Sequence, residues 1–352
     1  MRHNSLERTL IEKLEPAIVD VTPGVVVRAY HLGRMICDLQ LGQTQPIYDL
    51  ASLTKVIFTQ QAMMQAYDAG LWNFETLVKD ILPDFSFEQI KVRDLLTHTS
   101  GLEWWKPFYI DMPQNVSWIE RRAWLYQQIN KTELKKSDKA VYSDLGFMTL
   151  GFILEKLYSK TILEIWNNVK NDFYSTTTLD FNLENKPVAN VSLYAPTEEC
   201  SWRGKTMRGE VHDENTWALG GISTHAGLFG SIDDVAAFGL NVRSQLHGIA
   251  RYKVRQKTAQ LFAQRALPQE VGDWAMGYMM PSQENASCGP YFSVHSIGHT
   301  GFTGTSFWYD PRNDLLVSVL SNRVNYGREN KGFVSLRPKI HNWIFEVIKR
   351  TL

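Results

Sequence analysis

The chain is poor in cysteine and has no excess of charge of either sign. Its three cysteines, Cys37, Cys200 and Cys288, are odd in number and widely spaced, so neither a disulfide framework nor a metal-ligand spacing is expected. Lysine and arginine together number 37, and so do aspartate and glutamate. This balance argues against nucleic acid or an anionic membrane as the main partner.

Long hydrophobic runs are also missing. No stretch of the sequence reaches 18 consecutive apolar residues, so no transmembrane segment is expected. The first eight residues contain no apolar segment of the kind that secretion signals carry. As it stands, the sequence predicts a cytoplasmic protein, although a periplasmic protein whose signal peptide had been removed would read the same way. The oligomeric state does not follow from the sequence.

Hydrophobic residues are abundant, by contrast. They make up 44% of the 352 residues, against 21% charged residues, which is enough for a substantial core. Hydrophobic periodicity and turn residues predict helices over 6–18, 56–69, 87–96, 145–157 and 333–347. The same signals predict strands over 24–30, 35–41, 291–297, 305–309 and 315–320.

These elements predict an α+β fold in which the two ends of the chain meet. The simplest assembly pairs the terminal strands in one antiparallel sheet covered by the terminal helices. Residues 1–56 and 285–352 would then form an α/β sandwich, and residues 57–284 a mostly helical insertion, part of which could pack on the sheet.

Ser52 and Lys55 are the first candidates for chemistry. They are three positions apart ahead of an apolar run, and this spacing on a helix puts both side chains on one face. A serine hydroxyl becomes a useful nucleophile when a neighbouring base takes its proton, and a lysine whose charge is suppressed can do so. The pair indicates acyl transfer through a serine ester, but an S-x-x-K pattern alone is weak evidence.

Three further segments strengthen the pattern. They are Tyr142-Ser143-Asp144, His299-Thr300-Gly301, and the stretch from Leu95 to Leu102, which reads LLTHTSGL. Together with Ser52 and Lys55 they resemble the signature of the serine β-lactamase and penicillin-binding-protein superfamily. The closest resemblance is to the branch of class C β-lactamases, D-Ala-D-Ala carboxypeptidases and family VIII esterases, and it extends over nearly the whole chain.

The resemblance implies a β-lactamase-like fold and a role for each matching residue. Ser52 would attack a carbonyl, and Lys55 would either accept its proton or hold Tyr142 in a state that can. The backbone N–H groups of Ser52 and Phe302 would form the oxyanion hole. The remaining substrate-binding candidates are Asp144, His299, Thr300, Gly301 and Arg323. The resembled branch works without a metal, and no cofactor is expected.

Two positions depart from the β-lactamases of this branch. Asp144 replaces an asparagine, and a carboxylate can pair with Lys55 but cannot donate to a substrate carbonyl. His299 replaces a lysine and could be neutral or charged near pH 7, so it would hold a substrate carboxylate less firmly. Arg323 could supply that charge instead, or it could be an ordinary surface cation.

Two other groups are open to more than one interpretation. The segment from His212 to Asn215, with His225, matches no metal-binding motif and is better explained as scaffolding or as a loop that borders the site. Trp104 and Trp105 could equally line the cleft or pack in the interior.

The sequence therefore predicts a serine hydrolase that acts through an acyl-serine intermediate. The expected substrates are small esters or D-amino-acid amides and peptides, including peptidoglycan fragments, with weak or incidental β-lactamase activity. The alternative is a penicillin-binding sensor or a catalytically silent binding scaffold with the same fold.

Overall fold

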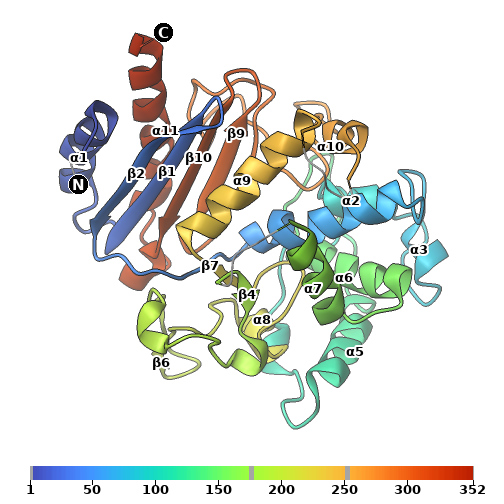
Figure 1. Ribbon diagram of the computed structural model, residues 1–352. Coiled ribbons are helices and arrows are strands. Elements are labelled where there is room, and N and C mark those ends of the chain that lie inside the picture. The colour runs from blue at the N-terminus through green and yellow to red at the C-terminus, as the bar shows by residue number, and fades with distance from the viewer. Residues whose placement is uncertain (1–2, 174–177, 250–253, 352) are drawn as a thin grey trace.

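The computed structural model describes residues 3–173, 178–249 and 254–351, and it places a sheet beside a mostly helical region (Figure 1). The α-helices are α1 (Ser5–Ala17), α2 (Gln60–Asp68), α3 (Val78–Ile81), α4 (Val92–Leu96), α5 (Trp118–Ile129), α6 (Asp144–Tyr158), α7 (Ile162–Phe173), α8 (Glu214–Ala218), α9 (Ile232–Leu246), α10 (Gln256–Phe262) and α11 (Gly332–Thr351). The strands are β1 (Gly24–His31), β2 (Arg34–Gly42), β3 (Tyr48–Asp49), β4 (Asp180–Phe181), β5 (Glu199–Cys200), β6 (Lys205–Thr206), β7 (Leu228–Gly230), β8 (Ile297–Thr300), β9 (Ser306–Asp310) and β10 (Leu315–Ser321).

The main sheet joins the two ends of the chain, as predicted. Its strand order is β2-β1-β10-β9-β8, and each neighbouring pair is antiparallel. The N-terminal hairpin meets the C-terminal strands where β1 pairs with β10, with Val27 opposite Val319. Both strands are rich in β-branched residues, which pack well on a pleated surface.

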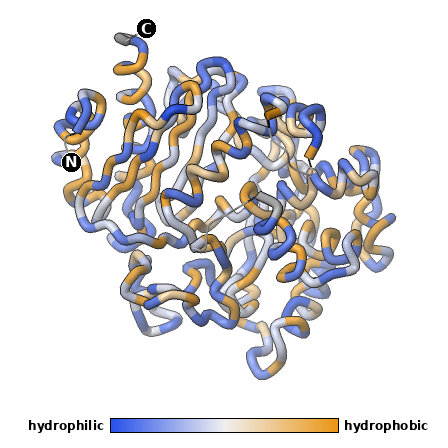
Figure 2. Tube along the Cα trace, in the orientation of Figure 1, coloured by the Kyte–Doolittle hydropathy of each residue, from blue (hydrophilic) through white to orange (hydrophobic). Residues whose placement is uncertain are grey.

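This sheet is covered on both faces. Helices α1 and α11 lie on one face and α9 on the other, and apolar residues line the strands between them (Figures 1 and 2). Because successive side chains of a strand point to opposite faces, Val25 and Val27 join the core beneath the terminal helices, whereas Val26 joins the larger core shared with the helical region.

Helix α6 crosses the centre of the helical region and begins beside the candidate nucleophile. Ser143 is its N-cap residue, and the Ser143 hydroxyl accepts a hydrogen bond from the Gly146 N–H at 3.1 Å. The helix is apolar on most of its surface and is therefore buried, as the sequence predicted.

Three local predictions are corrected by the structure. Residues 87–91 are not helical, and α4 starts only at Val92. Lys91 is its extended N-cap residue, and the Asp94 carboxylate fixes this boundary by accepting the Lys91 N–H at 2.8 Å. The predicted strand over 291–297 is wrong, since Ser293 turns the chain by donating to Asp310, and pairing begins at Ile297. The first helix, predicted over 6–18, begins one residue earlier at Ser5, because Asn4 caps it.

Helix α9 lies within the predicted inserted region, residues 57–284, yet packs on the main sheet. The division into a sandwich part and an insertion stays a prediction. Among the described residues, no helix combines the length and apolar character needed to cross a bilayer.

Candidate active site

Ser52 lies in a tight turn between β3 and the first buried helix. The preceding residue, Ala51, has a φ of +47°, a left-handed conformation that side chains other than glycine rarely adopt. The buried Asp49 carboxylate holds this turn by accepting the Ala51 N–H at 2.8 Å. Strain of this kind persists where the surroundings over-determine it, which is common at functional sites.

Lys55 follows in the first turn of a short π-helix, Lys55–Thr59, which continues into α2. The Lys55 N–H donates to the Ser52 carbonyl at 3.1 Å, so the backbone itself brings the two side chains onto one face. The sequence placed the start of this helix at residue 56 and did not predict the π-turn.

The structure brings the three predicted catalytic side chains together. Lys55 Nζ lies 3.0 Å from Ser52 Oγ, and the Tyr142 hydroxyl lies 2.8 Å from the same oxygen. Tyr142 comes from the segment just before α6, 90 residues away along the chain. Both distances are within hydrogen-bonding range, so proton transfer to and from Ser52 requires no large rearrangement.

The Lys55 ammonium lies against three oxygen atoms from separate segments of the chain. Besides Ser52, it contacts an Asp144 carboxylate oxygen at 2.7 Å and the His225 carbonyl at 2.8 Å. Burial lowers the pKa of Lys55, but the combined effect of Asp144 and Tyr142 is larger and opposite. The pKa of Lys55 therefore lies above its ordinary value. Lys55 is therefore a cation at neutral pH.

Tyr142 is a neutral phenol at rest. Burial raises the pKa of Tyr142, and the positive charge of Lys55 offsets only part of this effect. The sequence left open whether Lys55 or Tyr142 accepts the proton of Ser52. Because a charged Lys55 has no free lone pair, Tyr142 is favoured as the acceptor, with Lys55 assisting it.

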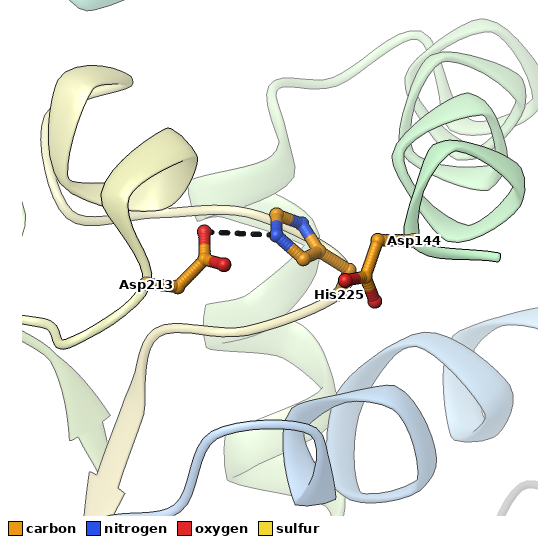
Figure 3. Close-up of side chains that lie close together, drawn as sticks. All are labelled: Asp144, Asp213 and His225. Carbon is orange, nitrogen blue, oxygen red and sulfur yellow. Dashed lines mark hydrogen bonds and ion pairs between the residues drawn. The ribbon is translucent and has the colours of Figure 1, made fainter. Parts of the chain in front are cut away.

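The His225 side chain holds its own loop in place, and the backbone carbonyl of His225 accepts the hydrogen bond from Lys55. Figure 3 shows its ring between Asp213 and Asp144, and Asp213 accepts a hydrogen bond from the ring at 3.0 Å. The potential ligand atoms of these three side chains lie within 4.8 Å of one another. Asp144 is already paired with Lys55, and Asp213 with His225 and the Thr216 N–H, which agrees with a scaffolding role for the 212–215 segment. That no metal is used stays a prediction.

Gly301 allows the edge of the main sheet to approach the nucleophile turn. A Cβ on Gly301 would lie 2.1 Å from the Thr305 hydroxyl and 2.7 Å from the Leu50 carbonyl. Any side chain there would push the strand away from the turn that carries Ser52. The Thr305 hydroxyl donates to the same Leu50 carbonyl at 3.0 Å and holds the two segments together.

The two predicted oxyanion donors are free to bind a ligand. Among the described residues, neither the Ser52 N–H nor the Phe302 N–H has a protein acceptor. The Phe302 ring is exposed and stacks on the His212 ring, with centroids 5.5 Å apart. Stabilisation of a tetrahedral oxyanion requires N–H groups that are not already bound to a protein acceptor, and the assignment of these two donors stays a prediction.

His299 is neutral, which settles a question that the sequence left open. It is only 1% exposed, and its Nδ1 lies 2.9 Å from the Thr300 carbonyl, so Nδ1 must be the donor. Burial, assisted by Lys55, lowers the pKa of His299 to about 3. The neighbouring Thr300 hydroxyl contacts the Met279 sulfur at 3.8 Å.

Arg323 is buried and is not a surface cation. It is 3% exposed, donates to the Asn330 carbonyl at 2.8 Å, and lies over the Phe302 ring at 4.9 Å. The sequence analysis missed a second buried cation, Arg337 in α11, whose guanidinium lies 3.5 Å from the Gly301 carbonyl. Burial and the charge of Arg323 lower the pKa of Arg337 to about 9.

Packing around Tyr142 was also missed. Trp274 stacks on the Tyr142 ring with centroids 5.8 Å apart, and His98 packs on it at 4.7 Å. The His98 Nδ1 accepts the Ser143 N–H at 3.0 Å, so His98 positions the segment that carries Tyr142. Nothing near Trp274 in the sequence indicates this contact.

Comparisons with known proteins identify the family of the chain. The Beta-lactamase family model matches residues 11–334, and the chain belongs to that family. A candidate D-alanyl-D-alanine carboxypeptidase from Salmonella agona (strain SL483) is 29% identical, over 89% of this chain and 79% of its own. The N-acetylmuramyl-L-alanine amidase of Bacillus subtilis (strain 168) is 30% identical, over 80% and 69%.

A solved structure shares the fold. EstCE1, described as a hydrolase with promiscuous acyltransferase activity, aligns with a TM-score of 0.74 at 17% identity, covering 96% of this chain and 98% of its own. The resemblance inferred from the sequence motifs and the expected α+β, β-lactamase-like fold are therefore confirmed.

Proposed function

We propose that this protein is a hydrolase that forms an acyl ester on Ser52 and releases it to water. Its substrates would be small esters or D-amino-acid amides and peptides, including peptidoglycan fragments, with incidental activity on β-lactams. The observation that carries the proposal is the convergence of Lys55 Nζ and the Tyr142 hydroxyl on Ser52 Oγ, at 3.0 and 2.8 Å.

The reaction follows from these contacts. In the fraction of molecules whose Tyr142 has lost its phenol proton to solvent, Ser52 Oγ attacks the substrate carbonyl carbon while its proton passes to the Tyr142 phenolate beside the Lys55 cation. The N–H groups of Ser52 and Phe302 stabilise the oxyanion. Collapse of the tetrahedral intermediate expels the amine or alcohol, which takes the proton from Tyr142. Water then adds to the ester by the same path, releases the acid and restores Ser52.

The two departures from the β-lactamase pattern support the choice of substrate. Asp144 is committed to Lys55 at 2.7 Å and, being a carboxylate, has no proton to donate to a substrate amide carbonyl. His299 is neutral and cannot form an ion pair with the carboxylate that β-lactams carry. Both features favour esters, and amides without a free carboxylate, over efficient β-lactam hydrolysis.

The test compares three substrates: a p-nitrophenyl ester, a peptide ending in D-Ala-D-Ala, and a chromogenic cephalosporin. Steady turnover of the ester or the peptide supports the proposal, and the substrate turned over identifies the preferred class. A stoichiometric burst without turnover would instead support the sensor, and no adduct with any of the three would support a silent scaffold.

The nucleophile is tested by mass spectrometry of the acylated protein. Ser52→Ala should abolish the adduct and reduce turnover by at least about 10³-fold, because the remaining oxyanion donors provide only residual catalysis. Ser100→Ala is the matched control, since this serine is also buried but makes no contact with Lys55 or Tyr142 in the described structure. An adduct that persists in Ser52→Ala would refute the assignment.

A further inference from the structure

Five aromatic side chains form a continuous row beside the candidate active site. We call this row the aromatic ladder and define it as Trp104, Trp105, Tyr109, Trp202 and Trp217. Consecutive ring centroids lie 5.8, 6.3, 4.5 and 5.3 Å apart, so each ring contacts the next. The members come from two segments about 100 residues apart in the sequence, and only the fold brings them together.

The ladder runs from the core to the surface: Tyr109 and Trp217 pack against the main core, whereas Trp104 and Trp202 are exposed. Trp104 is 60% exposed and Trp202 is 43% exposed, although indole is among the most costly side chains to leave in water. Scattered exposed apolar residues need no explanation, but Trp104 and Trp202 belong to one connected row whose other rings are partly buried, and a linked aromatic surface of this kind usually marks a binding surface. The sequence left Trp104 and Trp105 open between cleft and packing, and this exposure favours the cleft.

Hydrogen bonds to the backbone of residues 104–109 connect the ladder to the elements that build the site. The Trp104 carbonyl accepts the N–H of Asp144, whose carboxylate holds Lys55. Further along, the Asn215 side chain accepts the Tyr109 N–H at 3.0 Å and donates to the Lys106 carbonyl at 2.8 Å. A ligand lying on the ladder would therefore extend away from the region of Ser52 in a fixed direction.

Charged side chains border the rings. Glu103 forms ion pairs with Lys106 at 2.8 Å and with Lys135 at 3.5 Å. The Arg203 guanidinium lies over both Trp202 and Trp217, at 5.7 and 5.8 Å from their centroids. Flat apolar rings bordered by hydrogen-bonding groups suit a ligand with apolar faces and a polar rim.

We propose that the aromatic ladder binds a sugar ring of the substrate. A pyranose presents C–H groups on its faces and hydroxyl or acetamido groups around its edge, which matches exposed indoles with charged neighbours. A long acyl chain would instead need an enclosed aliphatic groove, and a peptide strand would need a free sheet edge. This inference rests on the proposed function and narrows it to glycan-bearing amides or esters, such as muramoyl peptides.

The test measures binding separately from catalysis. The Ser52→Ala protein is titrated calorimetrically with an N-acetylmuramoyl dipeptide and with the same dipeptide without its sugar. The sugar should strengthen binding by about tenfold or more. This advantage should disappear in a Ser52→Ala protein that also carries Trp104→Ala and Trp202→Ala.

Tyr291→Ala provides the matched control. Tyr291 is 46% exposed and also stacks on an aromatic ring, that of Phe345 in α11 on the outer face of the sheet. This variant should keep the full preference for the sugar. A preference lost equally in the control, retained without Trp104 and Trp202, or absent from the start would overturn the proposal.

Di-N-acetylchitobiose serves as a competitor and distinguishes the source of the sugar. Competition with the dipeptide by this disaccharide would mean that the ring alone is recognised, whereas competition only by free N-acetylmuramic acid would mean that the lactyl ether is also contacted. Either result supports the proposal, and competition by neither contradicts it. Failure of the proposed hydrolysis would appear separately, as the absence of a Ser52 adduct in the wild-type protein.

Discussion

At the scale of single residues, the site depends on how Asp144 controls the charges around Ser52. Its carboxylate holds Lys55 as a cation and also raises the pKa of Tyr142. The base that activates Ser52 must be deprotonated, and burial raises the pKa of Tyr142. Activity on an ester should therefore increase as the pH rises above neutrality, before the protein denatures.

Asp144→Asn should shift this alkaline rise to lower pH. Removing a negative charge that contacts Lys55 stabilises the deprotonated forms of both Lys55 and Tyr142, so the rise moves down whichever of them accepts the proton. We expect a shift of about one pH unit in the profile of kcat/KM against pH. The same variant should also show increased turnover of the chromogenic cephalosporin, because an amide can donate to the substrate.

Asp111→Asn is the control for this experiment, since Asp111 is exposed and does not contact Ser52, Lys55 or Tyr142 in the described structure. Its pH profile should match the wild-type profile. If Asp144→Asn leaves the alkaline rise in place, Asp144 does not set the charge state of the site.

At the scale of elements, the start of α6 determines where Tyr142 and Asp144 lie. Ser143 stands between them, and its hydroxyl caps the helix while donating to the Glu103 carbonyl at 2.7 Å. The sequence motif marked this segment, but the cap could not be assigned before the helix boundary was known. His98 and Trp274, which hold Tyr142 in place, come from separate elements.

Ser143→Ala should reduce both stability and activity. Losing the cap should lower the free energy of unfolding by about 1–2 kcal/mol, as measured by urea denaturation. The helix start should also loosen, so kcat on the ester should fall even under conditions in which the variant is fully folded.

Ser117→Ala provides the comparison, because Ser117 caps α5 in the same way at an exposed site. It should cost about 1 kcal/mol of stability with kcat unchanged. Equal effects of the two variants on kcat would mean that the α6 cap has no special role in the site.

At the scale of the whole molecule, stability in acid depends on buried imidazoles. His341 in α11 is completely buried beneath the sheet, and burial together with Arg337 lowers its pKa to about 3. The unfolded chain binds a proton on this histidine near pH 6.5, whereas the folded chain does not. The unfolded state thus binds more protons between these two values, and stability falls as the pH drops from 6.5 towards 3.

His341→Leu should reduce this loss. Between pH 7 and pH 5, one such histidine accounts for a decrease of about 2 kcal/mol in the free energy of unfolding. Urea denaturation at the two pH values should show a smaller difference for the variant than for the wild type. An unchanged difference would show that His341 takes up a proton in the folded state.

Contacts between segments of the folded molecule explain the errors in the secondary-structure prediction. The stretch 291–297 has strand-like composition, but Tyr291 and Val294 are exposed, and the Ser293 hydroxyl donates to Asp310 at the end of β9, 17 residues later. The burial of Arg323 and Arg337 could not be predicted from the sequence. It depends on how α11 packs against the segment that follows β8, which contains Gly301 and Phe302. Local patterns do not contain that information.

The sequence alone determined which side chains could do the chemistry and that the two ends of the chain would share a sheet. Spacing and periodicity are local properties, so they can be recognised in the sequence without a structure. Only the tertiary structure decided the charge of Lys55, the neutrality of His299 and the assembly of the aromatic ladder. Each of these depends on desolvation and on partners that are remote along the chain, because electrostatic and stacking energies depend on distance in space.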